Sequence, residues 1–355
     1  MQTIVELPSN NLLSGEVYSQ PPLTQDTTTQ ERLMTPSTDT RISADLEWAI
    51  LDAVSQLYLL TAEQLSRLLG YSYRYVQLGC QRLTARGMLE QLVVRRQTRH
   101  GTAPYIYTLG LKGYHSVKDH GSLPPMKRYR SIFERVHEDD PVIHTLAVNE
   151  FLLPFLILEK TDPNVTVEFI HELELNANPL RVSLPDTEKA AKFSPDGFVK
   201  VNFLNPPDTY CYQLEVYTSK FSKLRWQQKI HTYLHSFEAY KEYFETSHLD
   251  GIAVSVQSKM DFPKIDLTRL TAREQATWEY LEKKRAERFG NFLKWTSESF
   301  TAHNIPPSSP DADLFLFSQA PLTRTTPQEL LYGAHWQQPV TNAVKQLLPE
   351  QEATS

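Results

Sequence analysis

Two carboxylates stand out between residues 193 and 220. Asp196 follows a proline and precedes a glycine in Ser-Pro-Asp-Gly, and Glu215 lies in the apolar run 210–217. A glutamate is costly to bury in such a run unless it is paired or bound to a cation. Two carboxylates that converge from adjacent strands offer oxygen ligands to Mg²⁺, which can activate water and offset the charge of a scissile phosphate. The pattern predicts a Mg²⁺ site at Asp196 and Glu215.

A cation should stand near such a pair. Side chains alternate along a strand, so the position two residues after Glu215 shares its face, but that position is Tyr217, which is neutral at pH 7. The next cationic residues are Lys220 and Lys229. Lys229 stands beside the apolar stripe of an amphipathic helix expected over 223–244, so it can face the sheet. We therefore expect Lys229 to supply the ammonium group.

A structural alternative explains the same residues. In it, Asp196 caps a turn and Glu215 pairs with Lys229, so the second half of the chain is a non-catalytic platform. Fold and partial motif do not by themselves establish activity, so both hypotheses stay open at this point.

A second group of residues favours nucleic acid. Residues 62–118 carry nine Lys and Arg against two Glu, a local charge of +7 in a chain whose net charge is −6. The spacing predicts a helix over 73–86 with a buried stripe of Val76, Cys80 and Leu83. The opposite face offers side chains that can reach bases and phosphates in the major groove. These residues are Tyr73, Arg74, Gln77, Gln81 and Arg82.

A polar loop over 97–103 follows this helix, with Arg95, Arg96 and Arg99 at its base. The order of helix, helix, turn, helix, hairpin and helix is that of a winged helix-turn-helix, in which this loop would be the wing. Basic clustering on the recognition helix and wing together is typical of DNA binding. The alternative is a winged helix that contacts proteins.

The elements that position these residues fall into successive regions. Periodicity and composition predict an α+β or α/β protein, with an N-terminal winged helix-turn-helix followed by an αβββαβ domain. The expected regions are a disordered leader at 1–42, the winged helix at 43–120, a linker at 121–140, the second domain at 141–300 and an irregular segment at 301–355. His144 is expected near the domain junction.

Composition and the lengths of apolar runs predict where in the cell the protein is located. The hydrophobic fraction of 40% and charged fraction of 22% are ordinary for a globular protein. No apolar run approaches the roughly 18 residues of a membrane span, and the N-terminus lacks the pattern of a signal peptide. We therefore expect a cytoplasmic protein with no membrane partner. Cys80 and Cys211 are the only cysteines and are expected to be buried thiols.

Residues 142–257 resemble the PD-(D/E)XK nuclease superfamily, in element order and in Pro195-Asp196 and Glu215. The resemblance implies a metal-dependent nuclease and adds Glu150, in HTLAVNEF, as an acidic residue from the first helix. Glu172 and Glu174 match less well. Tyr217 departs from the pattern, because the superfamily has a lysine at that position.

The two halves together resemble the replication-relaxation family of plasmid and mobile-element proteins, over roughly 45–340. The resemblance is carried by LLTAEQLSRLLGYS, RLTARGMLEQL, PYIYTLGLKGY, SPDGF, LEVYTSK and KIHTY. It implies double-stranded DNA as a partner, with replication or relaxosome proteins alongside. The alternative function is a non-catalytic transcription regulator or relaxosome adaptor.

Overall fold

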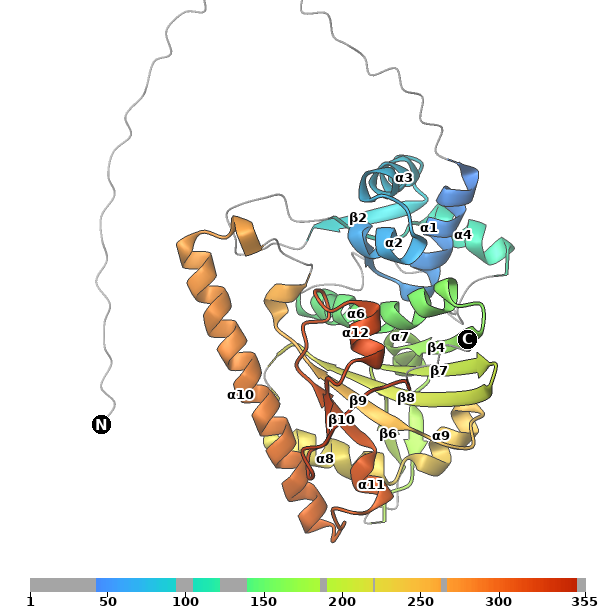
Figure 1. The fold of residues 1–355 in the computed structure, drawn as a ribbon. Coiled ribbons are helices and arrows are strands. Elements are labelled where there is room, and N and C mark those ends of the chain that lie inside the picture. The colour runs from blue at the N-terminus through green and yellow to red at the C-terminus, as the bar shows by residue number, and fades with distance from the viewer. Residues whose placement is uncertain are drawn as a thin grey trace, which may run out of the picture. The chain divides into compact units, whose positions relative to one another are not determined.

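The computed structural model describes residues 43–93, 105–121, 139–185, 190–219, 221–262 and 267–349 (Figure 1). The expected leader, the loop with Arg95, Arg96 and Arg99, and most of the expected linker lie outside these ranges. The described residues belong to one unit, Ile42–Ser355. Within it, a single hydrophobic cluster includes Leu46 near its start and Leu348 near its end.

The N-terminal part contains the expected helices and hairpin. Two strands of the described hairpin pair antiparallel, and a short additional strand joins them in the order β1-β3-β2. The elements are α1 (Ala44–Leu57), β1 (Leu60–Thr61), α2 (Ala62–Leu69), α3 (Tyr73–Ala85), β2 (Leu89–Val93), β3 (Tyr105–Leu109) and α4 (Leu111–Asp119).

Local sequence explains where α2 begins and ends. The Thr61 hydroxyl accepts a hydrogen bond from the Gln64 backbone N–H at 3.1 Å, and the Gln64 side chain accepts one from the Thr61 N–H at 3.0 Å. This reciprocal pair is a capping box, which the Thr-x-x-Gln spacing before an apolar run predicts. Gly70 ends the helix at φ +73°, in the left-handed region that favours glycine.

A mixed sheet organises the rest of the chain. Within the described ranges, seven strands run in the order β12-β11-β10-β9-β8-β7-β4. β8 and β10 are each parallel to β9, and the other neighbouring pairs are antiparallel. The strands are β4 (Val165–His171), β7 (Gly197–Leu204), β8 (Pro207–Tyr217), β9 (Gly251–Val256), β10 (Phe315–Ser318), β11 (Trp336–Gln337) and β12 (Val344–Lys345). The protein is a mixed α+β structure.

Helices pack against both faces of this sheet. α6 contacts β4, β7 and β8, while α10 runs alongside α8 (Figure 1). A two-stranded hairpin, β5 with β6, forms a separate small sheet. These elements are α6 (Asp139–Thr161), α7 (Glu172–Ala177), β5 (Leu180–Val182), β6 (Ala191–Phe193), α8 (Lys223–Leu234), α9 (Phe237–Phe244), α10 (Ala272–Ala302), α11 (Pro310–Asp313) and α12 (Pro327–Tyr332).

The alternation predicted for 210–217 is confirmed. Leu214 and Val216 belong to the hydrophobic cluster on the α6 side of the sheet. Cys211 and Tyr217 belong to the cluster on the side of α8 and α10. Residues 211–217 of β8 are therefore buried, so a charged side chain among them is costly unless it has a partner inside the protein.

Three segments differ from the sequence expectation. The alternation over residues 165–175 is typical of a strand, but β4 ends at His171, because the His171 side chain accepts the Leu173 N–H and begins α7. The single helix expected over 223–244 is divided into α8 and α9 at His235 and Ser236. The segment 301–355, expected to be irregular, supplies β10 to the central sheet, a long-range pairing that local periodicity does not encode.

The helix α6 is long and strongly apolar, although no membrane span was expected from the sequence. Its segment Pro141–Thr161 is long and apolar enough to cross a membrane by length and composition. However, 78% of that apolar window is buried inside the protein, as a core helix would be. α6 also contacts α2, where the Gln64 side-chain amide donates to the Leu146 carbonyl at 3.2 Å.

Candidate functional site

Asp196 immediately precedes β7 and is fixed there by two hydrogen bonds with β8. Its backbone N–H donates to the Leu214 carbonyl at 3.1 Å, and its Oδ2 accepts the Val216 N–H at 2.7 Å. Because Gly197 pairs with Leu214 in this antiparallel ladder, the next position outward sets Asp196 opposite Glu215. The two predicted carboxylates thus come from neighbouring strands.

The imidazole of His144, on α6, lies between two carboxylates. Its Nε2 is 3.3 Å from Asp196 Oδ1 and 3.1 Å from Glu172 Oε2. Glu172 is the first residue of α7, and its other oxygen accepts from the Thr145 hydroxyl at 2.5 Å. One ligand atom from each of His144, Glu172 and Asp196 lies within 4.8 Å of the other two. We call these three residues the His144 cluster.

Charge pairing dominates the His144 cluster. Burial by itself lowers the pKa of His144, but the charges and hydrogen bonds of Asp196 and Glu172 outweigh it and raise that pKa well above its ordinary value. Burial raises the pKa of Asp196, yet His144, Lys229 and the Val216 N–H together lower it below its ordinary value. In the protein alone, a protonated imidazole therefore balances the carboxylates.

Glu215 is fully buried and both of its oxygens are bonded. Oε2 lies 2.5 Å from Lys229 Nζ and accepts from the Tyr217 hydroxyl at 3.1 Å. Oε1 accepts from the Tyr233 hydroxyl. The structure thus brings Lys229, on α8, to Glu215, as the sequence predicted. Both hypotheses, the nuclease site and the structural pair, expect this contact, so it does not distinguish between them.

The two groups of charges act on each other. Burial raises the pKa of Glu215 to about 7, with Asp196 adding to the rise while Lys229 opposes it. Burial lowers the pKa of Lys229, but Glu215 and Asp196 raise it more strongly, and the net shift is upward. The site therefore contains a carboxyl group that can exchange a proton near neutral pH beside an ammonium that stays charged.

Glu150 lies elsewhere on α6. Its Oε2 is 2.6 Å from Arg67 Nη1 of α2, and its side chain is 5% exposed. Burial raises the pKa of Glu150, and Arg67 is the main opposing influence. The structure therefore pairs Glu150 with α2 and does not bring it to Asp196. Of the weaker candidates, Glu172 joins the His144 cluster, whereas Glu174 has Tyr58 as its side-chain partner.

His144 is the functional candidate that sequence reasoning missed. It was expected near a domain junction, yet it lies on a helix whose residues 142–158 contain only two titratable side chains, His144 and Glu150. A titratable group in so apolar a stretch is costly to bury unless it has a partner. That cost was the signal that could have marked His144 from the sequence.

The surface of α3 matches the sequence prediction. Val76, Cys80 and Leu83 are buried, as expected. Most residues of the predicted reading face are exposed, with Gln77 partly buried. That face consists of Tyr73, Arg74, Gln77, Gln81 and Arg82. The predicted wing residues Arg95, Arg96 and Arg99 lie outside the described residues.

Comparisons with known proteins add one family match. No curated protein matches the sequence. A structural comparison finds similarity to the crystal structure of Bacillus subtilis PadR in complex with operator DNA, with 18% identity, 40% of this chain and 83% of that chain covered, and a TM-score of 0.20. A similarity at this TM-score carries no argument about this chain. The sequence profile described as replication-relaxation matches residues 51–250, which run from α1 to the start of β9. Because that match covers more than half of the 355 residues, this protein belongs to the replication-relaxation family, which associates it with DNA replication.

Proposed function

We propose that this protein binds duplex DNA through α3, as a DNA-binding protein of the replication-relaxation type. The observation that carries the proposal is the division of α3 into a buried apolar stripe and an exposed face with Arg74, Gln81 and Arg82. Arginine and glutamine can each make paired hydrogen bonds to base edges, and arginine also contacts phosphates.

The elements around α3 also support duplex DNA binding. The order α1-β1-α2-α3-β2-β3-α4, with a three-stranded antiparallel sheet over the described ranges, is the order of a winged helix-turn-helix. In that fold, the helix corresponding to α3 enters the major groove. The +7 local charge of residues 62–118 supplies the attraction to phosphates.

Titration of full-length protein with fluorescent duplex DNA at several salt concentrations tests this function. Affinity should fall steeply with salt, and Arg74→Ala/Arg82→Ala should weaken binding and flatten the salt dependence by roughly one unit of slope per lost phosphate contact. Lys283→Ala is the matched control, because Lys283 is an exposed cation on α10. Affinity that is unchanged in the double variant would reject α3 as the reading helix.

A second candidate function is metal-dependent DNA cleavage, favoured by the His144 cluster beside Glu215 and Lys229. The elements α6, β4, β7, β8, α8 and β9 follow one another in this order, with α7, β5 and β6 inserted after β4 and α9 after α8. This order, with β8 parallel to β9, supports a restriction-endonuclease-like αβββαβ domain. The donor set fits a divalent cation, since two carboxylates and an imidazole converge within 4.8 Å. An imidazole suits Mn²⁺ or Zn²⁺ better than the Mg²⁺ expected from the carboxylates alone.

In this proposal each residue has a distinct task. His144, Glu172 and Asp196 would hold the cation, which when bound activates water and offsets charge on a phosphate. Lys229 would place its ammonium beside the reacting phosphate, and Glu215 would accept a proton, as its pKa of about 7 allows. The rival, a transcription regulator or relaxosome adaptor, uses the same pairs only to hold the fold.

A cleavage assay distinguishes the nuclease from the non-catalytic regulator or adaptor. Full-length protein is incubated with single-stranded, linear duplex and supercoiled plasmid DNA, with Mg²⁺ or Mn²⁺. The nuclease reading expects cleavage that Asp196→Asn abolishes and that Asp45→Asn, an exposed carboxylate on α1, leaves intact. Wild-type protein that is inert on all three substrates would reject the nuclease and leave the adaptor.

A further inference from the structure

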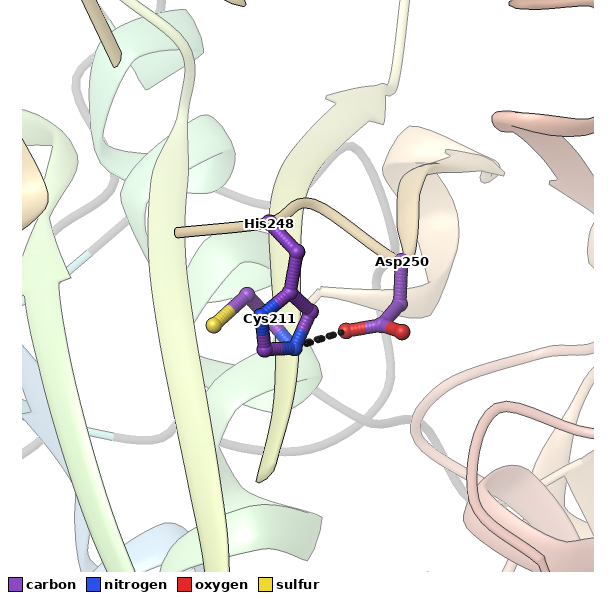
Figure 2. A group of neighbouring side chains, drawn as sticks. All are labelled: Cys211, His248 and Asp250. Atoms are coloured by element: carbon purple, nitrogen blue, oxygen red, sulfur yellow. Dashed lines mark hydrogen bonds and ion pairs between the residues drawn. The ribbon is translucent and has the colours of Figure 1, made fainter. Parts of the chain in front are cut away.

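A second group of metal-ligating side chains lies on β8, four residues before Glu215. Cys211 comes from β8, and His248 and Asp250 come from the loop that leads into β9 (Figure 2). One ligand atom from each of the three lies within 4.8 Å of the other two. The loop is tied to the strand at this point, because the Asp250 N–H donates to the Cys211 carbonyl at 2.9 Å and Asp250 Oδ2 accepts the Cys211 N–H at 2.7 Å.

We propose that Cys211, His248 and Asp250 form a zinc-binding site that clasps the loop before β9 to β8. Zinc takes thiolate, imidazole and carboxylate ligands, and this is a set of three with a fourth position left for water. In tetrahedral zinc sites a sulfur and a nitrogen ligand lie about 3.5 Å apart, so the atoms need move inward by only roughly 1 Å.

Two of the three side chains are open to solvent. The His248 side chain is 44% exposed and that of Asp250 is 29% exposed, so a cation can reach the group from solvent. His248 Nε2 already lies 3.4 Å from Asp250 Oδ2 (Figure 2). The other ring nitrogen, Nδ1, lies 3.2 Å from the Ser247 hydroxyl, which can fix the ring in place as outer-shell partners of zinc-bound histidines do.

Local charge is compatible with a cation. Lys200 pairs with Cys211 across β7 and β8, so its ammonium lies near the thiol. That ammonium is 3.1 Å from Glu168 Oε1 on β4, which offsets its charge. A divalent cation bound beside Cys211 would therefore not face an uncompensated ammonium.

A nucleophilic thiol is the other chemistry that a cysteine, a histidine and an aspartate can perform. In such a set one ring nitrogen faces the carboxylate and the other faces the nucleophile. Here Nε2 faces Asp250 and the Thr209 carbonyl, at 2.9 Å from the latter, and Nδ1 faces Ser247. The Cys211 thiol is fully buried and lies 3.2 Å from the Thr246 hydroxyl. This geometry favours a metal ligand over a nucleophile.

Cobalt replacement tests the site in the full-length protein. After removal of bound metal with a chelator, Co²⁺ should produce tetrahedral d–d bands and a thiolate-to-cobalt charge-transfer band, both of which Zn²⁺ should abolish. Cys211→Ser should remove the charge-transfer band, whereas Cys80→Ser should keep it, because Cys80 is the other cysteine of the chain and lies in α3. A Co²⁺ ion at the His144 cluster gives no such band, since that cluster contains no thiol.

His248→Gln provides a variant that preserves the fold, because His248 is partly exposed. It should lower the affinity of the thiolate site for zinc at least tenfold, and zinc should raise the melting temperature of this variant less than it raises that of the wild type. His335→Gln, at an exposed histidine, should behave like the wild type. Wild-type protein without a thiolate-to-cobalt band, or zinc binding that is unchanged in both Cys211→Ser and His248→Gln, would overturn the site.

Discussion

The fully buried carboxylate of Glu215 lies 2.5 Å from the ammonium of Lys229, fourteen residues later in the chain. β8 and α8 meet so that a strand residue and a helix residue neutralise each other inside the protein. Burying either charge alone would be costly, whereas the pair with its two tyrosine hydroxyls satisfies the carboxylate.

Removal of the ammonium should destabilise the fold. Lys229→Met leaves Glu215 buried without its counter-charge, and at pH 8 we expect a loss of about 3 kcal/mol in the free energy of unfolding, measured with urea. The double variant Glu215→Gln/Lys229→Met should recover part of this loss, because no buried charge remains. A double variant less stable than Lys229→Met would contradict this account.

Stability should also depend on pH through Glu215. Its pKa is raised from 4.5 to about 7, so between these values the folded protein keeps a proton that the unfolded chain has released. Stability from this group is therefore present at low pH and is lost as the pH rises toward 7, by about 3 kcal/mol at 1.36 kcal/mol per pKa unit. Urea unfolding of metal-free protein at pH 5 and pH 7.5 measures this loss. Glu215→Gln should show a smaller decline, and an identical decline in both proteins would refute the assignment.

Arg67 and Glu150 should tie α2 to α6 without serving the His144 cluster. Arg67→Met should cost about 2 kcal/mol of unfolding free energy, since it leaves a buried acceptor without its donor. Glu150→Gln should leave Mn²⁺ affinity within twofold of the wild type. A large loss of metal affinity in Glu150→Gln would restore the role that the nuclease resemblance implied for Glu150.

His144 should control metal binding at its cluster. His144→Gln removes the imidazole ligand while keeping the helix, and we expect Mn²⁺ affinity, measured by titration calorimetry or electron paramagnetic resonance, to fall at least tenfold. His335→Gln is the matched control on an exposed histidine. Equal affinity in the two variants would mean that His144 serves only as a charge partner of Asp196 and Glu172.

Two residues of α3 should differ in what they contribute to DNA recognition. Gln81→Ala should change the preferred sequence in a selection from random duplexes and cost about 1–3 kcal/mol on the preferred site. Arg82→Ala, if it contacts phosphate, should weaken binding evenly over all sequences. Selected sequences that are the same for wild type and Gln81→Ala would exclude Gln81 from base reading.

Much of the secondary structure could be predicted because it depends on near neighbours. The Thr61–Gln64 capping box, the end of α2 at Gly70 and the alternation along β8 each involve residues a few positions apart. The same local periodicity predicted that Lys229 faces the sheet. These features follow from helix and strand geometry, which sequence spacing specifies directly.

The sequence by itself determined which residues share a face, and therefore that Glu215 needed a partner and that α3 has a polar outer side. Only the tertiary structure decided which helix residue meets Asp196. His144 and Glu150 lie six positions apart on α6, which turns their side chains about 120° away from each other around the axis. Packing directs one of them to Asp196 and the other to Arg67, and that rotation depends on how α6 lies between α2 and the sheet, which no local pattern encodes.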